Sequence, residues 1–392
     1  MLCGKILVAH PGLQHSYQLA EALYEIDSLG LYISGTPLKN HADIWGSVFI
    51  PKKIEAKIRS TSIPLNLRQH NISWHIARLI ANKLPINNFE FNYRMFHMFD
   101  AWIASRISKL RPSIVVGYDN SCARTFEVAK SLGIKCILDA PSVHYEYAKE
   151  DVFLKKSIKY RDSIKKQKLQ EVSLADQIIV CSNFAASTYE ANGVEPNRLK
   201  VIHLGSEPPL SLQRIRRHKK DELRFVFAGT MSFRKSTDIL LAVFRELGSV
   251  AQLTIVGGSE SKQWIDECNS LPNVSYLGHK PQSELYEIIA ESDCLILPSR
   301  FDAFGMVVVE ALSVGTPVIV SENVGAKEVV EMFPGAGIIT PVNACAIKDT
   351  IKKLVSSPTK LENMNDAAYQ SGAYFSWRRY RKRVSEFVSD LS

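Results

Sequence analysis

Short, mostly apolar runs recur along this chain, each followed by a glycine, a proline or a polar residue, and they constrain its fold more than any other feature. Examples are Lys5–His10 (KILVAH), Lys135–Asp139 (KCILD) and Cys294–Pro298 (CLILP). Such runs are typical of parallel strands that are buried on both faces of a sheet. Strand, helix and strand follow one another at short intervals, which predicts right-handed, doubly wound parallel sheets.

A break in this pattern divides the chain into two parts. Pro208–Glu222 (PPLSLQRIRRHKKDE) holds two prolines and dense charge and shows no apolar periodicity, which is typical of an interdomain linker. A chain of 392 residues, 46% of them hydrophobic and 22% charged, is long enough for two globular domains of ordinary size. We therefore expect a first α/β domain over residues 1–206, a linker over 207–222 and a second α/β domain over 223–372.

One acid interrupts an otherwise apolar helix in the second half. Met306–Val314 is expected to be a helix that stops at Gly315, and Glu310 is its one charged residue. A buried carboxylate is costly unless it is paired or hydrogen-bonded, and a ligand rich in hydroxyl groups would supply those bonds. The alternative is an ordinary strand–helix–strand unit with a half-exposed glutamate, and the segment alone leaves both interpretations open.

The loop before this helix predicts an anion site. The backbone N–H groups of Phe304, Gly305 and Met306 open the helix, where the macrodipole favours negative charge. Asp302 lies eight positions before Glu310, at the loop end of the same unit. The segment thus offers a phosphate cradle and two carboxylates for the hydroxyl groups of a sugar and a ribose. A role for the aspartate as a helix N-cap is the alternative.

A second loop suits a diphosphate. Gly229 follows the apolar run Leu223–Ala228, and Arg234 and Lys235 come next, before a helix expected over Thr237–Leu247. Arginine offers a planar fork of donors and lysine a point charge, and both match phosphate oxygens. Cations in such loops are usually unremarkable, but together with the acidic segment they favour phosphate binding.

The residues from Asp302 to Ala311 (DAFGMVVVEA) resemble the acid-x7-acid signature of glycosyltransferase family 4, which usually reads E-x-F-G-x4-E-A. The first acid is aspartate here, one methylene shorter, and Thr230 and Ser236 stand where the family usually has arginine and glycine. The resemblance covers nearly the whole chain and is strongest over about 223–340. It implies the GT-B fold, in which two doubly wound Rossmann-like domains face each other across a cleft. A final helix, here residues 373–392, would cross back onto the first domain.

The resemblance also implies a function. Members of this family are retaining enzymes that move a sugar from a nucleotide-diphosphate sugar to a hydroxyl group, with no metal or other cofactor required. The first domain would bind the acceptor, a glycan or a lipid-linked molecule, and the second domain the donor. The expected role is the synthesis of cell-surface polysaccharide or another glycoconjugate.

Roles for individual residues follow from the same resemblance. Glu310 would hold the donor ribose, and Asp302 and Ala303 would hold the donor sugar. Glu310 and Asp302 would also be catalytic residues. The group expected around the diphosphate consists of Gly229, Arg234, Lys235, Phe304, Gly305 and Met306. Gly278 and His279 would border the nucleobase.

The first domain contributes candidates from two loops at strand ends, which face the ligand crevice in an open α/β sheet. His144 follows the strand that ends at Asp139 and stands where the family often has a histidine. It would hydrogen-bond sugar hydroxyls or assist proton transfer, and a structural loop histidine is the alternative. Gly12, Gln14 and His15, in the turn after the first strand, are candidate acceptor contacts, with a plain turn as the alternative.

The net charge of +8 and the isoelectric point near 9.0 predict acidic partners, such as a nucleotide phosphate, an anionic membrane face or a polyanion. Nucleic acid is disfavoured, because the chain has no zinc-finger spacing, RRM-like aromatic motif or long basic tail. Basic residues, Arg59 among them, gather in a helical pattern over about 50–99 and again over 151–170. Docking on anionic lipid is one interpretation, but a solvated helix face is favoured.

The cysteine content and the apolar runs bear on location. Seven cysteines without CxxC spacing favour reduced thiols and disfavour a zinc site. No run approaches the roughly 20 apolar residues of a membrane-spanning helix, and the start of the sequence resembles neither a signal nor a transit peptide. We expect a cytoplasmic protein, with peripheral contact at the inner membrane face as the alternative.

Two other functions are compatible with these features. A sugar-nucleotide epimerase on the same fold would release free sugar or epimerised nucleotide without an acceptor. A non-catalytic module that binds nucleotide sugar or docks on a membrane would show no transfer at all, with Asp302 as a sign of decay.

Overall fold

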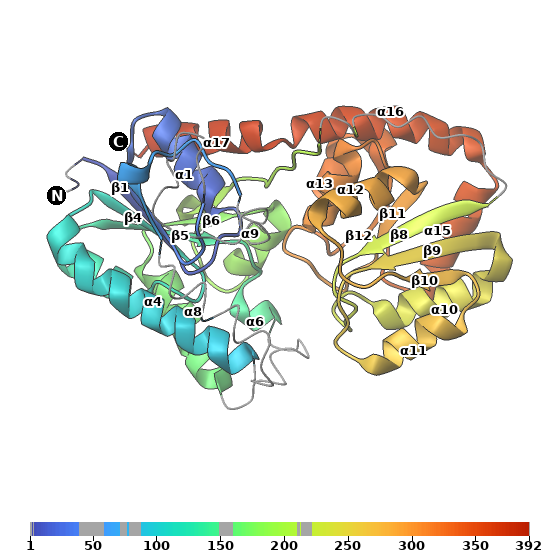
Figure 1. Ribbon diagram of the computed structural model, residues 1–392, viewed down its shortest axis with the longest axis horizontal. Helices are drawn as coiled ribbons and strands as arrows, with labels where there is room; N and C mark the ends of the chain where they lie inside the picture. The colour runs from blue at the N-terminus through green and yellow to red at the C-terminus, as the bar shows by residue number, and fades with distance from the viewer. Residues whose placement is uncertain are drawn as a thin grey trace.

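The computed structural model describes two α/β units that lie side by side, each built around one sheet (Figure 1). The residues that the structure describes are 2, 4–38, 59–70, 77, 88–148, 160–209, 212 and 222–391. Most of the expected linker, and most of the basic residues around 50–87 and 151–159, therefore lie outside the described residues.

The first sheet has seven strands in the order β3-β2-β1-β4-β5-β6-β7, and every neighbouring pair is parallel. Its strands are β1 (Ile6–His10), β2 (Leu29–Ser34), β3 (Arg68–His70), β4 (Ile114–Tyr118), β5 (Lys135–Ala140), β6 (Gln177–Val180) and β7 (Leu199–Val201). The central strands β1 and β4 are buried along their whole length, as expected from their unbroken apolar runs.

The second sheet has six strands in the order β10-β9-β8-β11-β12-β13, again with every neighbouring pair parallel. Its strands are β8 (Leu223–Ala228), β9 (Ala251–Val256), β10 (Val274–Tyr276), β11 (Cys294–Leu297), β12 (Val318–Ser321) and β13 (Gly337–Thr340). The strand order reverses beside β1 in one sheet and beside β8 in the other, so both sheets are doubly wound as predicted. In such sheets ligands bind outside the carboxyl ends of the strands, near the reversal.

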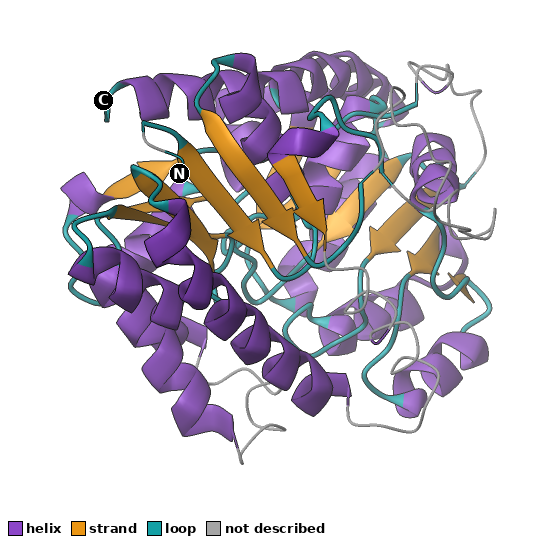
Figure 2. Ribbon diagram, turned by 60° about the vertical axis from the view of Figure 1, so that its left-hand side comes forward, coloured by secondary structure: helices purple, strands orange, loops and turns teal. Residues whose placement is uncertain are grey.

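Helices flank the strands of both units (Figure 2). In the first unit they are α1 (Ser16–Glu25), α4 (Asn88–Leu110), α5 (Ala123–Ser131), α6 (Tyr145–Ala148), α8 (Arg161–Leu174) and α9 (Asn183–Glu190). In the second unit they are α10 (Thr237–Leu247), α11 (Lys262–Ser270), α12 (Gln282–Glu291), α13 (Met306–Ser313), α14 (Lys327–Met332), α15 (Ala344–Val355) and α16 (Pro358–Tyr374). The helix predicted over Thr237–Leu247 is confirmed as α10, which buries Leu240, Leu241 and Phe244 on one face and ends before Gly248.

The last helix, α17 (Trp377–Ser389), returns to the first unit and lies against α1 (Figure 1). Polar contacts hold it there: an Arg381 guanidinium N–H donates to Gln18 Oε1 over 2.6 Å, and Arg381 Nε lies 2.8 Å from Glu25 Oε1. The chain therefore crosses between the units twice, once after Ser206 and once before α17. These crossings lie side by side, because Ser206 and Ser376 form a parallel bridge.

A buried carboxylate connects the two units. Glu328 on α14 accepts hydrogen bonds from the Asn183 amide (2.8 Å) and the Phe184 backbone N–H (3.0 Å), and it lies 2.7 Å from Nε2 of His203. Nearby, the Ser182 hydroxyl donates to the Ala303 carbonyl over 2.5 Å. We call the Glu328 contacts with Asn183, Phe184 and His203 the interdomain clamp.

The clamp sets the ionisation of Glu328. Burial alone would raise the pKa of this carboxyl, but the hydrogen bonds from His203 and from the start of α9 outweigh burial and hold the pKa below its usual value of 4.5. A lowered pKa in the folded state means that the carboxylate contributes stability above the unfolded-state pKa, and that this contribution is lost as pH falls through the folded-state pKa.

The longest helices carry charged and polar residues along their length, and none of the described helices is long and apolar enough to cross a membrane.

The Glu328→Gln variant should unfold more easily than the parent at pH 7, by about 1–3 kcal/mol, because the neutral amide replaces one carboxylate oxygen by a donor. The difference should begin to shrink as pH falls below about 4.5 and should disappear below the lowered folded-state pKa, where the parent carboxyl is protonated in the folded protein too. Denaturant unfolding at several pH values measures both effects. The control is Glu331→Gln, an exposed position on the same helix, which should stay within about 0.5 kcal/mol of the parent at every pH. A pH-independent difference for Glu328→Gln would contradict the assignment.

Candidate active site in the interdomain cleft

A cavity of about 380 Å³ lies between the two units, and both contribute to its wall. Its lining from the first unit and the crossing segments consists of Gln14, His15, Arg59, Pro141, Leu204, Gly205, Ser206 and Trp377. Its lining from the second unit consists of Gln282, Tyr286, Asp302, Phe304, Gly305, Met306 and Glu310. The cavity therefore brings the acidic segment of the second unit opposite the loop after β1.

Glu310 reaches this cavity from α13, whose neighbouring side chains Val308, Val309 and Ala311 are fully buried. The Gln282 amide donates to Glu310 Oε1 over 3.2 Å. Burial raises the pKa of Glu310, and the contact with Gln282 opposes this effect only in part. The second carboxylate oxygen has no hydrogen-bond partner among the described residues, so it can accept a hydrogen bond from a ligand hydroxyl.

Asp302 is paired with the two cations of the Gly229 loop. The Lys235 ammonium contacts its Oδ2 atom directly, and Arg234 lies 3.6 Å from the same oxygen. Burial acts to raise the pKa of Asp302, but the two positive charges outweigh it and hold the pKa below its usual value. The sequence interpretation treated the acid and the two cations as separate ligand contacts, whereas the structure places them in one ion pair.

Gly305 determines how the acidic loop enters α13. Its φ of 88° lies in the left-handed region, and an added Cβ would stand 2.9 Å from side-chain atoms of both Leu297 and Val324. The Phe304 N–H, which we predicted to face an anion, donates to Asp302 Oδ1 over 3.3 Å. The N–H groups of Gly305 and Met306 still open the helix, where no intrahelical acceptor is in reach.

The loop after β8 uses two unusual backbone conformations. Gly229 has a φ of 144° and donates its N–H to the Val256 carbonyl over 2.8 Å. Ser236, which directly follows Lys235, has a φ of 56°. Glycine adopts such a left-handed conformation with less strain than serine. The Ser236 hydroxyl is buried and has no partner among the described residues.

Arg59 is a cleft residue that the sequence interpretation misplaced. We expected it on a solvated helix face, but it lies in a non-helical segment and its guanidinium N–H groups donate to the Tyr17 hydroxyl (2.8 Å) and to Gln282 Oε1 (2.9 Å). Gln282 in turn contacts Glu310, so a chain of polar contacts crosses the cleft. The pattern of basic residues could not reveal the contact across the cleft, because Arg59 and Gln282 lie 223 residues apart in the sequence.

The loop after β1 carries the three candidate acceptor contacts, and two of them line the cavity. Gln14 has a φ of 39°, and His15 lies 2.9 Å, through Nε2, from Oδ2 of Asp139. Gly12 is buried and donates its N–H to Nδ1 of His10. Asp139, a partner that we did not assign to the site from sequence, is the last residue but one of β5 and lies near the His144 loop.

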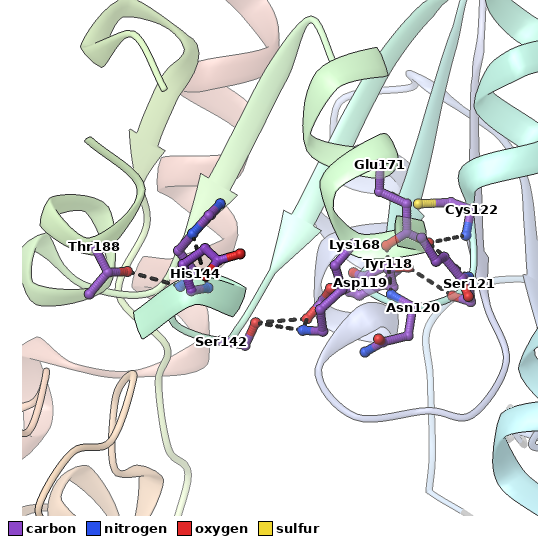
Figure 3. A network of polar contacts seen from close by, with 12 residues as sticks. Tyr118, Asp119, Asn120, Ser121, Cys122, Ser142, His144, Lys168, Glu171 and Thr188 are labelled. Atoms are coloured by element: carbon purple, nitrogen blue, oxygen red, sulfur yellow. Dashed lines mark hydrogen bonds and ion pairs between the residues drawn. The ribbon is translucent and has the colours of Figure 1, made fainter. Parts of the chain in front are cut away.

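His144 does not line the cavity. Its backbone N–H donates to the Thr188 hydroxyl over 3.0 Å, and its Nδ1 accepts the Glu146 N–H at 3.3 Å. Burial lowers the pKa of His144, which favours the neutral imidazole. Figure 3 shows it beside a second polar group, in which the Asp119 carboxylate accepts from Ser142 and Lys168.

The two residues expected near the nucleobase, Gly278 and His279, also lie outside this cavity. The Gly278 carbonyl accepts the N–H of Gly257 at 2.9 Å, and His279 is exposed after β10. Lys235, Arg234 and Gly229 do not line the cavity either, but the two cations reach its wall through Asp302. As for metals, we find no group of three or more His, Cys, Asp or Glu side chains within the described ranges that could hold an ion.

Comparison with known proteins shows which family this chain resembles. A family model described as "Glycosyl transferases group 1" matches residues 211–371. An uncharacterized glycosyltransferase of Methanocaldococcus jannaschii is 24% identical over 263 residues, which cover 66% of this chain and 71% of that protein. The chain spans about half or less of the length of the next curated relatives it matches.

Solved structures are similar over the whole chain. Sucrose-phosphate synthase from Thermosynechococcus elongatus has a TM-score of 0.66 at 17% identity. The two structures align over 100% of this chain and 99% of the synthase chain. Anabaena HepE in complex with UDP-glucose has a TM-score of 0.64 at 14% identity, and the two structures align over 98% of this chain and 99% of the HepE chain. These likenesses confirm the GT-B fold that the sequence predicted.

The Ser236→Gly variant should be more stable than the parent by up to about 1 kcal/mol. Glycine adopts φ = 56° without the strain that serine bears. Removal of the Ser236 hydroxyl breaks no hydrogen bond, because this hydroxyl has no partner among the described residues. Thermal and denaturant unfolding measure the change. Ser270→Gly, the same substitution at the exposed end of α11, should be neutral or destabilising. Destabilisation by Ser236→Gly would show that its hydroxyl is used.

The Lys235→Met variant should lose at least about tenfold in affinity for a nucleotide diphosphate, because it removes a charge-assisted contact worth about 1.5–3 kcal/mol. Isothermal titration of the diphosphate that binds the parent measures this. Lys262→Met, at an exposed position on α11, should bind as the parent does. Unchanged affinity in Lys235→Met would mean that Lys235 serves only to pair with Asp302.

Proposed function

We propose a reaction for this chain on the premise that it belongs to the group 1 glycosyl transferases. The protein transfers a sugar from a nucleotide-diphosphate sugar to a hydroxyl group of an acceptor that enters the cleft between the two units. The single observation that carries this proposal is the ion pair of Asp302 with Lys235 and Arg234 at the wall of a cavity that also holds Glu310.

The ion pair suits a site that works with a dianionic leaving group. A diphosphate that enters beside Gly305 and Met306 competes with Asp302 for Lys235 and Arg234. The two cations then stabilise the negative charge that develops on the diphosphate as the bond to the sugar breaks, which lowers the barrier because this charge is largest in the transition state. Asp302, once its cations are shared, is free to accept hydrogen bonds from the donor sugar.

Glu310 is assigned to the donor ribose. Gln282 occupies one of its carboxylate oxygens, and the other is left for a ribose hydroxyl. The UDP-glucose complex of the similar HepE structure supports a nucleotide sugar as the donor class. The raised pKa of Glu310 fits a carboxyl that gains hydrogen bonds only when its ligand is present.

The proposal also covers the stereochemistry of the transfer, the metal requirement, the acceptor and the place where the enzyme works. The reaction proceeds with retention of the anomeric configuration and needs no bound metal, since Lys235, Arg234 and the start of α13 neutralise the leaving group. The acceptor is a glycan or a lipid-linked molecule, and the product belongs to a cell-surface polysaccharide or glycoconjugate. The enzyme works in the cytoplasm, where its basic segments allow contact with the inner membrane face. Proton NMR of the first product reports the configuration, and activity in excess chelator reports the metal requirement.

A thermal-shift screen against UDP, GDP, ADP, CMP and their common sugar conjugates tests the donor. A ligand present at about one hundred times its dissociation constant adds roughly 2.7 kcal/mol of stability, which is readily measured. We expect one diphosphate to stabilise the parent selectively. The Glu310→Ala variant should lose most of that shift and the transfer activity, whereas Glu287→Ala, exposed on α12, should keep both.

The outcomes separate the candidate functions. Conversion of the donor to epimerised nucleotide or free sugar, with no dependence on an added acceptor, would favour an epimerase. No shift with any nucleotide, together with no transfer by the parent, would favour a non-catalytic module.

A further inference from the structure

Arg59 places a positive charge at the wall of the cleft, on the side of the first unit. It lines the cavity that also holds Asp302 and Glu310. Both hydrogen bonds that its guanidinium donates to described residues go to neutral groups, the Tyr17 hydroxyl at 2.8 Å and Gln282 Oε1 at 2.9 Å. No carboxylate among the described residues lies within ion-pair distance of this guanidinium, and Gln282 stands between it and Glu310.

The segment that carries Arg59 is fixed on α1. The Thr61 hydroxyl and the Ser62 backbone N–H donate to Glu21 Oε1 over 2.9 Å and 3.1 Å. The other carboxylate oxygen of Glu21 lies 3.6 Å from Arg381 of α17. Glu21 thus holds the Arg59 segment in place, and it is itself satisfied by partners other than Arg59.

The guanidinium of Arg59 keeps donors for a ligand. An arginine side chain carries five N–H groups in a planar fork, and the contacts with Tyr17 and Gln282 use one on each terminal nitrogen. Such a fork matches the oxygens of a phosphate or a carboxylate and binds them with charge-assisted hydrogen bonds. A neutral hydroxyl group would use the fork but not its charge.

Two neighbours in the cavity wall suit a sugar. Gln14 lines the cavity, and its side-chain amide has no hydrogen-bond partner among the described residues, so it can bind sugar hydroxyls. Trp377, at the start of α17, is half-buried in the same wall and offers an apolar ring to the C–H face of a sugar. Pockets that combine an aromatic surface with a few polar groups are typical ligand sites. The wall around Arg59 therefore fits a molecule that is both a sugar and an anion.

We propose that Arg59 binds a phosphate or carboxylate group of the acceptor; this inference rests on the transfer function proposed above and specifies the acceptor class. The donor diphosphate has its own cations, Lys235 and Arg234, in the second unit. Arg59 belongs to the opposite unit, on which we expect the acceptor. The acceptor is then an anionic sugar or glycan, or a sugar joined to a lipid through phosphate. Arg59 holds it by the anion and takes no part in the chemical step.

The test compares acceptors with and without an anion, using the donor that the parent accepts. Hexose 6-phosphates and hexuronic acids carry the anion on the sugar, and their control is the uncharged hexose. A hexose linked to farnesyl diphosphate carries the anion on the lipid side, and its control is the farnesyl hexoside. The parent should prefer one of these charged classes to its control, and the preferred class identifies the source of the anion.

The Arg59→Gln variant should lose this preference. The ratio of kcat/KM for the charged acceptor to kcat/KM for its uncharged control should fall at least about tenfold, chiefly through KM, because one charge-assisted contact is removed. Arg59→Lys, which keeps the charge without the fork, should retain part of the ratio. Isothermal titration of the charged acceptor into protein saturated with the nucleotide diphosphate measures the same loss as affinity. Arg94→Gln, exposed on α4 and outside the cavity lining, should keep the parent ratio.

The parent would overturn the inference if it showed no preference for any charged class, and so would Arg59→Gln if it kept the parent ratio. Loss of the nucleotide thermal shift in Arg59→Gln would assign Arg59 to the donor and would also overturn it. In each of these cases the transferase function stands if the parent shows a nucleotide shift and transfer. Absence of both in the parent would overturn the function and the inference together.

Discussion

The carboxylate of Glu328 is the interaction on which the arrangement of this molecule depends. It extends from α14 of the second unit to the start of α9 and to His203 of the first, and it replaces lost hydration with three hydrogen-bonding partners. It acts together with other contacts between the units, such as those of Ser182 with Ala303 and of Arg59 with Gln282. The cavity is lined from both units, so its shape depends on how contacts of this kind hold the units together.

A second buried carboxylate, Asp302, shows the same principle in a different role. Its charge is compensated by Lys235 and Arg234, which are also the groups best suited to a diphosphate. In the unliganded protein the acid and the cations satisfy one another, and a donor that carries both a diphosphate and hydroxyl groups can satisfy them separately. The site is thus stable when empty and remains attractive to a ligand of that chemistry. Glu310 lacks a cation at ion-pair distance in the described ranges, and the chain of contacts through Gln282 to Arg59 is its link to the first unit.

The first unit contributes a buried histidine, His15, to the wall of the cavity. His15 directly precedes α1 and its partner Asp139 lies on β5, and β4 places Tyr118 against the His15 ring. Tyr380 reaches the same ring from α17, so the helix that crosses back onto the first unit also supports its side of the cleft.

The division between what sequence and tertiary structure decide can be followed in single residues. Local rules were enough for the strands and many helices: unbroken apolar runs predicted buried parallel strands, and α10 was predicted at its observed ends because apolar spacing and Gly248 are local signals. The spacing of Asp302 and Glu310 within one strand–helix unit likewise predicted that both lie at one site, and both line the cavity. Arg59 was predicted to lie in a helix but does not, and the long helix α16 was not predicted. In both places the spacing of apolar residues is less regular than in α10.

Contacts between distant residues were beyond local rules. The pairing of Lys235 with Asp302, of Arg59 with Gln282 and of His15 with Asp139 depends on how two sheets are wound and how two units meet. The sequence by itself determined the two doubly wound sheets and the chemistry of the donor loops, because strand burial and loop composition act over a few residues. Only the tertiary structure decided which acid faces which cation and which histidine faces the cleft, because electrostatic pairing depends on distance in space and not on separation along the chain.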